Sequence, residues 1–234
     1  MLLEASGLTK RFGGVVALSS VDLSVAEGQV FGLIGPNGAG KTTLINVISG
    51  HFRADAGAIR FAGADVTALR PDQLARRGIA RTFQSIRLFK GLTVLENVLV
   101  GGFVRGSPPA RARALLEQFG LGGRADAFAG ELAYGDQRRL EIARALAAEP
   151  RLLILDEPAA GMNPTESAAL RDLLRTLAAE GITIVLIEHD VRLVMGASER
   201  VAVLSFGRKI AEGTPAEIQA DPVVREAYLG TADA

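Results

Sequence analysis

A glycine-rich run in the first quarter of the chain is the stretch most clearly suited to chemistry. It fills every fixed position of Gly-x-x-x-x-Gly-Lys-Ser/Thr, a pattern with which proteins bind phosphate groups. The run, called here the phosphate loop, consists of Gly35, Pro36, Asn37, Gly38, Ala39, Gly40, Lys41, Thr42 and Thr43. In this pattern Lys41 contacts the β- and γ-phosphates of a nucleotide and the Thr42 hydroxyl binds Mg²⁺. The alternative is a glycine-rich turn without a ligand.

The residues on either side of the phosphate loop fit the structural context that the pattern requires. The apolar run at residues 30–34 predicts a buried strand, and residues 42–49 predict a helix that ends at Gly50. The glycines of the loop let backbone N–H groups approach phosphate oxygens, and the helix N-terminus adds a partial positive charge. This strand–loop–helix context favours a phosphate site over an empty turn.

Two carboxylates follow a second apolar run and suggest the chemistry. Asp156 and Glu157 come directly after the apolar residues 152–155, which predict a buried strand. Open α/β sheets bind ligands at the carboxyl ends of their strands. We expect Asp156 to hold Mg²⁺, directly or through water, and Glu157 to orient and deprotonate an attacking water. Two acids that merely end a strand are the alternative, and the phosphate loop upstream favours the catalytic interpretation.

Composition narrows the class of protein. The chain has 234 residues, 48% of them hydrophobic, which is enough for one large core. Lys plus Arg and Asp plus Glu number 26 each, so no overall positive field favours nucleic acid as a partner. No cysteine is present, which excludes disulfides and cysteine-based zinc sites. We expect a soluble cytoplasmic protein that meets a membrane only through a partner, because neither a signal peptide nor a long apolar run occurs.

Strand and helix patterns alternate along most of the chain. Strands are predicted at residues 2–9, 15–25, 79–83, 182–187 and 201–205, in addition to those above, with a β-hairpin at 55–67. Helices are predicted from Pro71 and at residues 110–119, and capping boxes indicate others after Thr93, Asn163 and Thr214. This alternation predicts a mostly parallel sheet covered by helices. Strand patterns disappear at residues 85–146, which we interpret as a helical insertion between core segments 1–84 and 147–234.

Three single residues allow two interpretations each. Phe12 lies in a glycine-rich turn, where it could stack on a base or pack in the core. His51 follows the helix after the phosphate loop and is expected to be a solvated loop residue rather than a ligand. His189 ends an apolar strand, where a lone histidine is usually structural.

Taken together, these motifs resemble those of the ATP-binding subunits of ABC (ATP-binding cassette) transporters, over essentially the whole chain. The matching residues, in the order of that family, are the phosphate loop (its Walker A motif), Gln84, the segment 132–137, the strand 152–157 and His189. The resemblance implies a P-loop NTPase (RecA-like) α/β core with an antiparallel β subdomain and an inserted α-helical subdomain. It also implies that Phe12 stacks on adenine, that Gln84 senses Mg²⁺ and links core to insertion, and that His189 contacts the γ-phosphate.

The segment 132–137, called here the signature segment, departs from the common family sequence Leu-Ser-Gly-Gly-Gln. It consists of Leu132, Ala133, Tyr134, Gly135, Asp136 and Gln137. In the family this segment begins a helix that faces the γ-phosphate bound by the opposite subunit. Ala133 lacks the serine hydroxyl, and Asp136 adds a negative charge. Gly135 and a helix N-terminus predicted near Asp136 remain to contact the phosphate.

Three further runs resemble the branched-chain amino acid (Liv-type) uptake subfamily. They lie at residues 81–89, 132–144 and 157–164. The helical insertion is short for that subfamily: it has Gly-Ser-Pro-Pro at residues 106–109, where longer members carry extra residues. Transport of another solute, such as urea or amides, therefore stays open. A non-transport ABC ATPase on nucleic acid or ribosomes is disfavoured by the single cassette, and a P-loop kinase or GTPase would not explain the signature segment or His189.

The resemblance also implies cofactors and partners. Two such chains, identical or similar, would sandwich two ATP molecules with Mg²⁺, and Thr42, Gln84 and Asp156 would hold the metal. Partners would be two transmembrane permease subunits and, indirectly, an extracytoplasmic solute-binding protein. The chain would lie at the cytoplasmic face of the inner membrane, and no nucleic-acid partner is expected.

Overall fold

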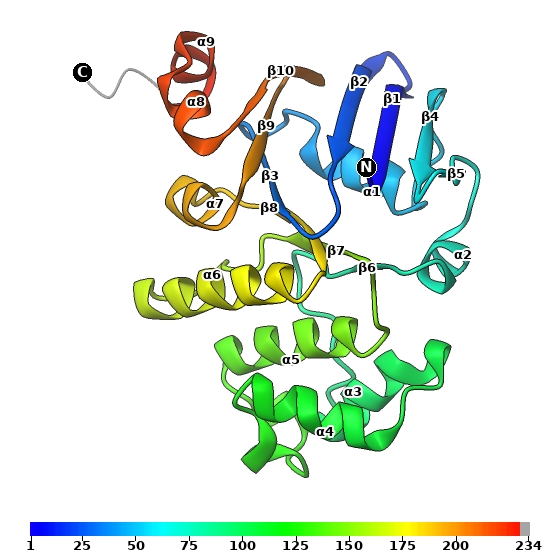
Figure 1. Ribbon diagram of the computed structural model, residues 1–234, viewed down its shortest axis with the longest axis vertical. Helices are drawn as coiled ribbons and strands as arrows, with labels where there is room; N and C mark the ends of the chain where they lie inside the picture. Colours follow the sequence, from blue (N-terminus) through cyan, green and yellow to red (C-terminus); the bar gives the residue numbers. More distant parts are fainter. Residues whose placement is uncertain (230–234) are drawn as a thin grey trace.

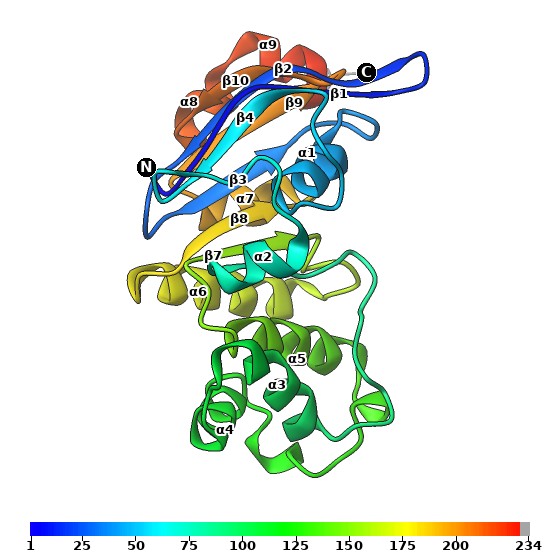
Figure 2. The same cartoon turned by 90° about the vertical axis from the view of Figure 1, so that its right-hand side faces the viewer.

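Two β-sheets and a group of helices follow one another along the long axis of the molecule (Figure 1). The computed structural model describes residues 1–229. The small sheet lies at one end and the large sheet in the middle (Figure 2). At the other end lie helices α3 (Val94–Gly102), α4 (Pro109–Gln118) and α5 (Tyr134–Leu146). Among the described residues, no helix combines the length and apolar character needed to cross a bilayer.

The large sheet has six strands in the order β10-β9-β3-β8-β7-β6. Five of them run parallel, and β10 pairs antiparallel with β9 at one edge. The strands are β3 (Val30–Ile34), β6 (Ile79–Arg81), β7 (Leu152–Asp156), β8 (Thr183–Ile187), β9 (Arg200–Ser205) and β10 (Arg208–Gly213). Every residue of β3, β7 and β8 is buried, as expected for parallel strands covered on both faces.

The small sheet is antiparallel and lies over one face of the large sheet. Its order is β2-β1-β4-β5, formed by β1 (Leu3–Phe12), β2 (Val15–Val25), β4 (Ala56–Phe61) and β5 (Ala64–Asp65). Its apolar side chains share one core with α1 (Lys41–Ile48) and with alternate residues of β3, β7 and β8. The predicted hairpin between residues 55 and 67 is confirmed by the antiparallel pairing of β4 and β5.

Helices cover the opposite face of the large sheet. They include α6 (Pro164–Ala179) and α7 (Val191–Ala197), which pack their apolar residues against the other residues of the same strands. The three predicted capping boxes are confirmed, at Thr93, Asn163 and Thr214. Helices α8 (Pro215–Ala220) and α9 (Pro222–Val224) pack in the same core. Helix α2 (Pro71–Arg76) instead packs Leu74 in the core shared with the small sheet.

The helical end of the molecule contains α3 (Val94–Gly102), α4 (Pro109–Gln118) and α5 (Tyr134–Leu146). Helix α5 begins at Tyr134, two residues before the start predicted near Asp136. Strand β6 ends at Arg81 instead of Phe83, and residues 82–92 then run without helix or strand to α3. This irregular segment connects the sheet to the helical end and carries Gln84.

Candidate nucleotide-binding site

The phosphate loop joins β3 to α1 in a backbone conformation that two of its glycines make possible. Gly35 has φ +151°, and a Cβ there would lie 2.2 Å from the Leu204 carbonyl oxygen. Gly40 has φ +102°, and a Cβ there would lie 2.6 Å from the Ala17 carbonyl oxygen. Glycine is therefore required at both positions, because any side chain would collide with neighbouring backbone.

The N-terminus of α1 is free to bind an anion. No side chain caps it, and no acidic residue stands in its first turn. Its unpaired backbone N–H groups and the helix dipole together favour a negatively charged ligand. Lys41, at the first position of α1, is buried and donates to the carbonyl oxygens of Gly35 (2.6 Å) and Pro36 (3.1 Å). Burial lowers the pKa of Lys41, while the negative charges of Glu157 and Asp156 oppose that shift.

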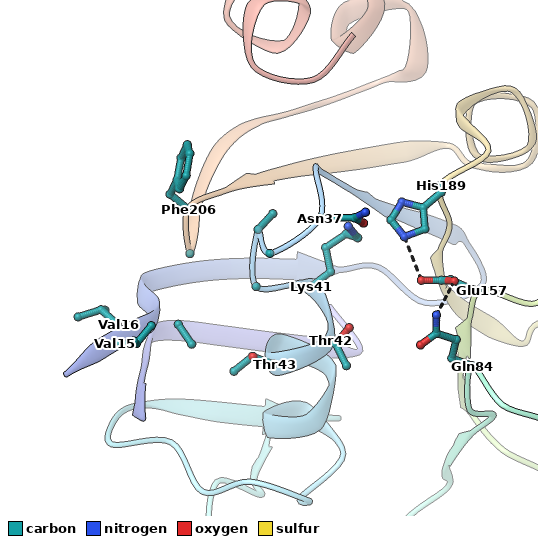
Figure 3. Close-up of a pocket in the computed structure, with 15 residues that line it drawn as sticks. Val15, Val16, Asn37, Lys41, Thr42, Thr43, Gln84, Glu157, His189 and Phe206 are labelled. Carbon is teal, nitrogen blue, oxygen red and sulfur yellow. Dashed lines mark hydrogen bonds and ion pairs between the residues drawn. The ribbon is translucent and has the colours of Figure 1, made fainter. Parts of the chain in front are cut away.

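A cavity of about 490 Å³ opens above this helix end (Figure 3). The sequence-predicted residues that line it are Asn37, Gly38, Ala39, Gly40, Lys41, Thr42, Thr43, Gln84, Glu157 and His189. Gly35 and Pro36 do not line the cavity, but their carbonyl oxygens accept hydrogen bonds from Lys41, which does. At the far end the wall is formed by Val15 and Val16 of β2 and by Phe206, whose side chain is 89% exposed. The cavity thus joins a polar end, at the phosphate loop, to an apolar end.

Glu157 is held on both sides at the polar end of the cavity. Gln84 Nε2 donates to Glu157 Oε2 at 2.9 Å, and His189 Nε2 lies 3.0 Å from Glu157 Oε1 (Figure 3). Glu157 has φ +51°, uncommon for a residue with a side chain, and its N–H donates to the Ile187 carbonyl oxygen (2.9 Å). A carboxylate oriented in this way, beside a phosphate site, can position a water molecule and accept its proton.

Asp156 lies behind the cavity and does not line it. Its side chain is buried, and Arg81 Nη2 lies 3.0 Å from Asp156 Oδ2. Arg81 also donates to Asn46 Oδ1 (2.6 Å) and Ser49 Oγ (2.9 Å), both on the α1 side. Burial raises the pKa of Asp156, and the Arg81 guanidinium counteracts that rise. Arg81, to which the sequence analysis assigned no role of its own, ties this carboxylate to α1.

Two of the predicted residues lie elsewhere. Phe12 is half exposed and packs edge-to-face on Phe52, with ring centroids 5.3 Å apart, so it is not part of the cavity wall. His51, expected to be a solvated loop residue, is exposed and contacts the Phe83 ring at 5.6 Å. Stacking of Phe12 on a base stays a prediction.

The signature segment lies outside this cavity, at the start of α5. The helix has no side-chain cap, so the backbone N–H groups of its first turn are free. Asp136 pairs with Arg139, which offsets the negative charge that the departure from the family sequence introduces. Gln137 Nε2 donates to the Leu132 carbonyl oxygen at 2.8 Å and so closes the segment on itself.

Glu188 is a buried carboxylate that the sequence analysis missed. Its Oε1 accepts from the N–H of Ala159 (2.6 Å) and its Oε2 from that of His189 (3.1 Å). It therefore joins the loop after Glu157 to the residue that contacts Glu157. Burial raises the pKa of Glu188, whereas these backbone hydrogen bonds lower it. Its position between an apolar strand and His189 was the only signal in the sequence.

Comparison with known proteins decides the family. The model of the ABC transporter family matches residues 18–160, more than half of the chain. This chain belongs to the ABC transporter ATP-binding family. A second model, described as branched-chain amino acid ATP-binding cassette transporter, matches residues 208–234.

Individual relatives agree over the full length. The chain is 45% identical to the high-affinity branched-chain amino acid transport ATP-binding protein BraF of Pseudomonas aeruginosa, over 99% of this chain and 98% of the relative. It is 44% identical to LivG of Escherichia coli over the same shares. The ADP conformation of MJ1267, an ATP-binding cassette of an ABC transporter, superposes with a TM-score of 0.89 at 36% identity, covering 98% of both chains. This ABC cassette is an ATP hydrolase with the P-loop NTPase α/β fold predicted from sequence.

Replacement of Glu188 by glutamine should change how stability depends on pH. A carboxyl whose pKa is raised on folding stabilises the folded state most below its ordinary value of 4.5, and this contribution is lost as the pH rises through the folded-state pKa. The unfolding free energy of the wild type minus that of Glu188→Gln should therefore decrease as the pH rises above 4.5. Urea denaturation at several pH values measures it. The exposed substitution Glu180→Gln controls for loss of one charge, and a difference that grows with pH would contradict the assignment.

Proposed function

We propose that this ABC cassette powers the import of branched-chain or other hydrophobic amino acids, with Glu157 as the catalytic base. The observation that carries the catalytic part is the Glu157 carboxylate, held between Gln84 and His189 at the cavity that Lys41 lines. The solute assignment is supported by the names of BraF and LivG and by their identity across almost the whole chain.

ATP would bind with its phosphates at the polar end of the cavity. The free N–H groups of the phosphate loop and α1 would surround the β- and γ-phosphates, with the Lys41 ammonium beside them. The adenine ring would lie towards Val15, Val16 and Phe206. Phe12 is the candidate for stacking, because it pairs in register with Val15 across the β1–β2 hairpin.

The residues near Lys41 fit a magnesium ion that is bound mostly by its substrate. Thr42 and Gln84 line the cavity with neutral oxygens, and the Gln84 amide nitrogen is already occupied by Glu157. Mg²⁺ typically takes one or two protein ligands and completes its shell with phosphate and water. Thr42 and Gln84 would hold it, with Asp156 behind them, and Mg²⁺ would neutralise charge on the phosphates.

Hydrolysis follows from the position of Glu157. A water molecule attacks the γ-phosphorus and gives its proton to the Glu157 carboxylate. The bond to the β-phosphate oxygen breaks and leaves ADP and inorganic phosphate. Gln84 and His189 keep the carboxylate in place, and such positioning is the main protein contribution to phosphoryl transfer.

A second ATP-binding chain would complete the site. Two copies, or this chain and a similar one, would pack head to tail, so that Gly135 of each faces the γ-phosphate held by the other. The uncapped first turn of α5 and the pairing of Asp136 with Arg139 support this role. A related ATP-binding cassette, MJ0796, 29% identical to this chain, is described as dimeric with ADP and phosphate bound (TM-score 0.82, covering 92% of this chain and 99% of that one).

The proposed architecture gives each part of the chain a task. Residues 1–84 and 147–234 would form the nucleotide-binding core, and residues 85–146 the helical subdomain. The latter would pass the motion to two transmembrane permease subunits at the cytoplasmic face of the inner membrane. An extracytoplasmic solute-binding protein would deliver the amino acid to those subunits.

Glu157→Gln should lower the ATP turnover number by at least about 100-fold, because the general base is lost while the shape of the site is kept. ATP affinity should be retained. Lys41→Ala is the contrasting variant and should weaken ATP binding about 10- to 100-fold by removing a charged donor. Phosphate release and titration with a fluorescent ATP analogue measure the two effects. Turnover like that of the wild type in Glu157→Gln would contradict the general-base role.

The membrane partners can be tested with the same variant. Glu157→Gln with ATP and Mg²⁺ should hold the closed state, and its pull-down from detergent-solubilised native membranes should recover multi-span membrane proteins. Binding of leucine, compared with urea and amides, to the associated solute-binding protein would then identify the solute. Recovery of only soluble proteins or nucleic acid would overturn the transporter assignment and leave the ATPase assignment intact.

A further inference from the structure

Arg138 is a fully buried arginine on the same helix as the signature segment. Its side chain is 0% exposed although it lies only four residues from the start of α5. Burial of a charge is costly unless the group is paired and hydrogen-bonded. The contacts of Arg138 show what its burial achieves.

The Arg138 guanidinium donates hydrogen bonds to the backbone of the irregular segment 82–92, which carries Gln84. Nη1 donates to the Phe83 carbonyl oxygen (2.8 Å) and Nη2 to the Gln84 carbonyl oxygen (2.7 Å). One planar guanidinium thus binds two consecutive carbonyl groups. A lysine at this position could not do the same, because its ammonium group lacks this planar arrangement of donors. The segment contains no helix or strand, and these two hydrogen bonds hold its backbone at Phe83 and Gln84.

Two neighbours on α5 hold the guanidinium in turn. Glu141 Oε2 accepts from Nη1 at 2.9 Å, and the Tyr134 hydroxyl lies 3.2 Å from Nη2. The other oxygen of Glu141 accepts from the N–H of Arg87 (3.1 Å), further along the same irregular segment. Tyr134 stands where the common family sequence has glycine, so this departure supplies a further acceptor for Arg138.

A continuous series of short contacts therefore runs from the start of α5 to the catalytic carboxylate. It passes from Tyr134 to Arg138, from Arg138 to the backbone of Gln84, and from the Gln84 amide to Glu157. Buried ion pairs contribute little net stability but favour one arrangement over others. We propose that Arg138 is a positioning residue that fixes Gln84 against Glu157 and ties it to the first turn of α5. This inference rests on the proposed roles of Glu157 and Gln84.

The test is a cycle of substitutions on the turnover number. Arg138→Met alone leaves the buried Glu141 with only the more distant Arg144, at 3.9 Å, as an ionic partner. The variant used is therefore Arg138→Met with Glu141→Gln, which removes both charges of the close pair. The glutamine oxygen can still accept from the Arg87 N–H. This double variant should keep ATP affinity within about threefold and lower turnover about 10- to 100-fold, since a shift of about 1 Å in a positioned group costs up to about 100-fold. The exposed substitution Arg113→Met is the matched control and should leave turnover unchanged.

The same double variant is then made in a Gln84→Ala background. If Arg138 acts through Gln84, its loss should cost less than about threefold there, because effects within one unit are not additive. An equal loss in both backgrounds, which a fold defect or an independent role would give, overturns the inference. So does unchanged turnover in the double variant alone. Absence of ATP hydrolysis by the wild type would instead overturn the proposed catalytic function, and this inference with it.

Discussion

The structure of the site depends on the two contacts that hold the Glu157 carboxylate, from Gln84 and from His189. These three residues are far apart in the sequence. They meet because β6, β7 and β8 are adjacent parallel strands, and each of the three residues follows the carboxyl end of one of them. The left-handed backbone of Glu157 turns its side chain into the cavity at that edge. The large sheet therefore brings the segments that follow β6, β7 and β8 together around the Glu157 carboxylate.

Three buried charged side chains connect the residues around Glu157 to neighbouring segments. Arg81 joins Asp156 to the α1 side, Glu188 joins His189 to the loop after Glu157, and Arg138 joins Gln84 to α5. Each such group carries a desolvation penalty that offsets much of its attraction to its partner. What the three groups share is that their hydrogen bonds link segments that are distant in the sequence. Fixed positions of this kind are what the proposed reaction requires, because a water molecule would have to be placed beside a phosphate.

Local patterns predicted much of this molecule, because they depend on residues close in the chain. The phosphate loop, the strand before Asp156 and the three capping boxes are of this kind, and the structure has them where the sequence indicated. Gln84 and His189 were singled out from the sequence, but Arg138 and Glu188, which hold them, were missed, since their roles depend on partners that only the fold brings close. The same holds for the start of α5, where Tyr134 joins the helix and contacts Arg138. The sequence also did not predict that the Phe12 ring packs edge-to-face on Phe52, because that contact again depends on the fold.

The most direct test of Glu157 as the proton acceptor is a high-resolution structure of Glu157→Gln with ATP and Mg²⁺. An ordered water should lie within hydrogen-bond reach of the side chain at position 157, about 2.6–3.2 Å, and in line with the γ-phosphate. Gln84 and His189 should flank that side chain. A water held in line by another group, with the side chain at position 157 turned out of the cavity, would contradict the account.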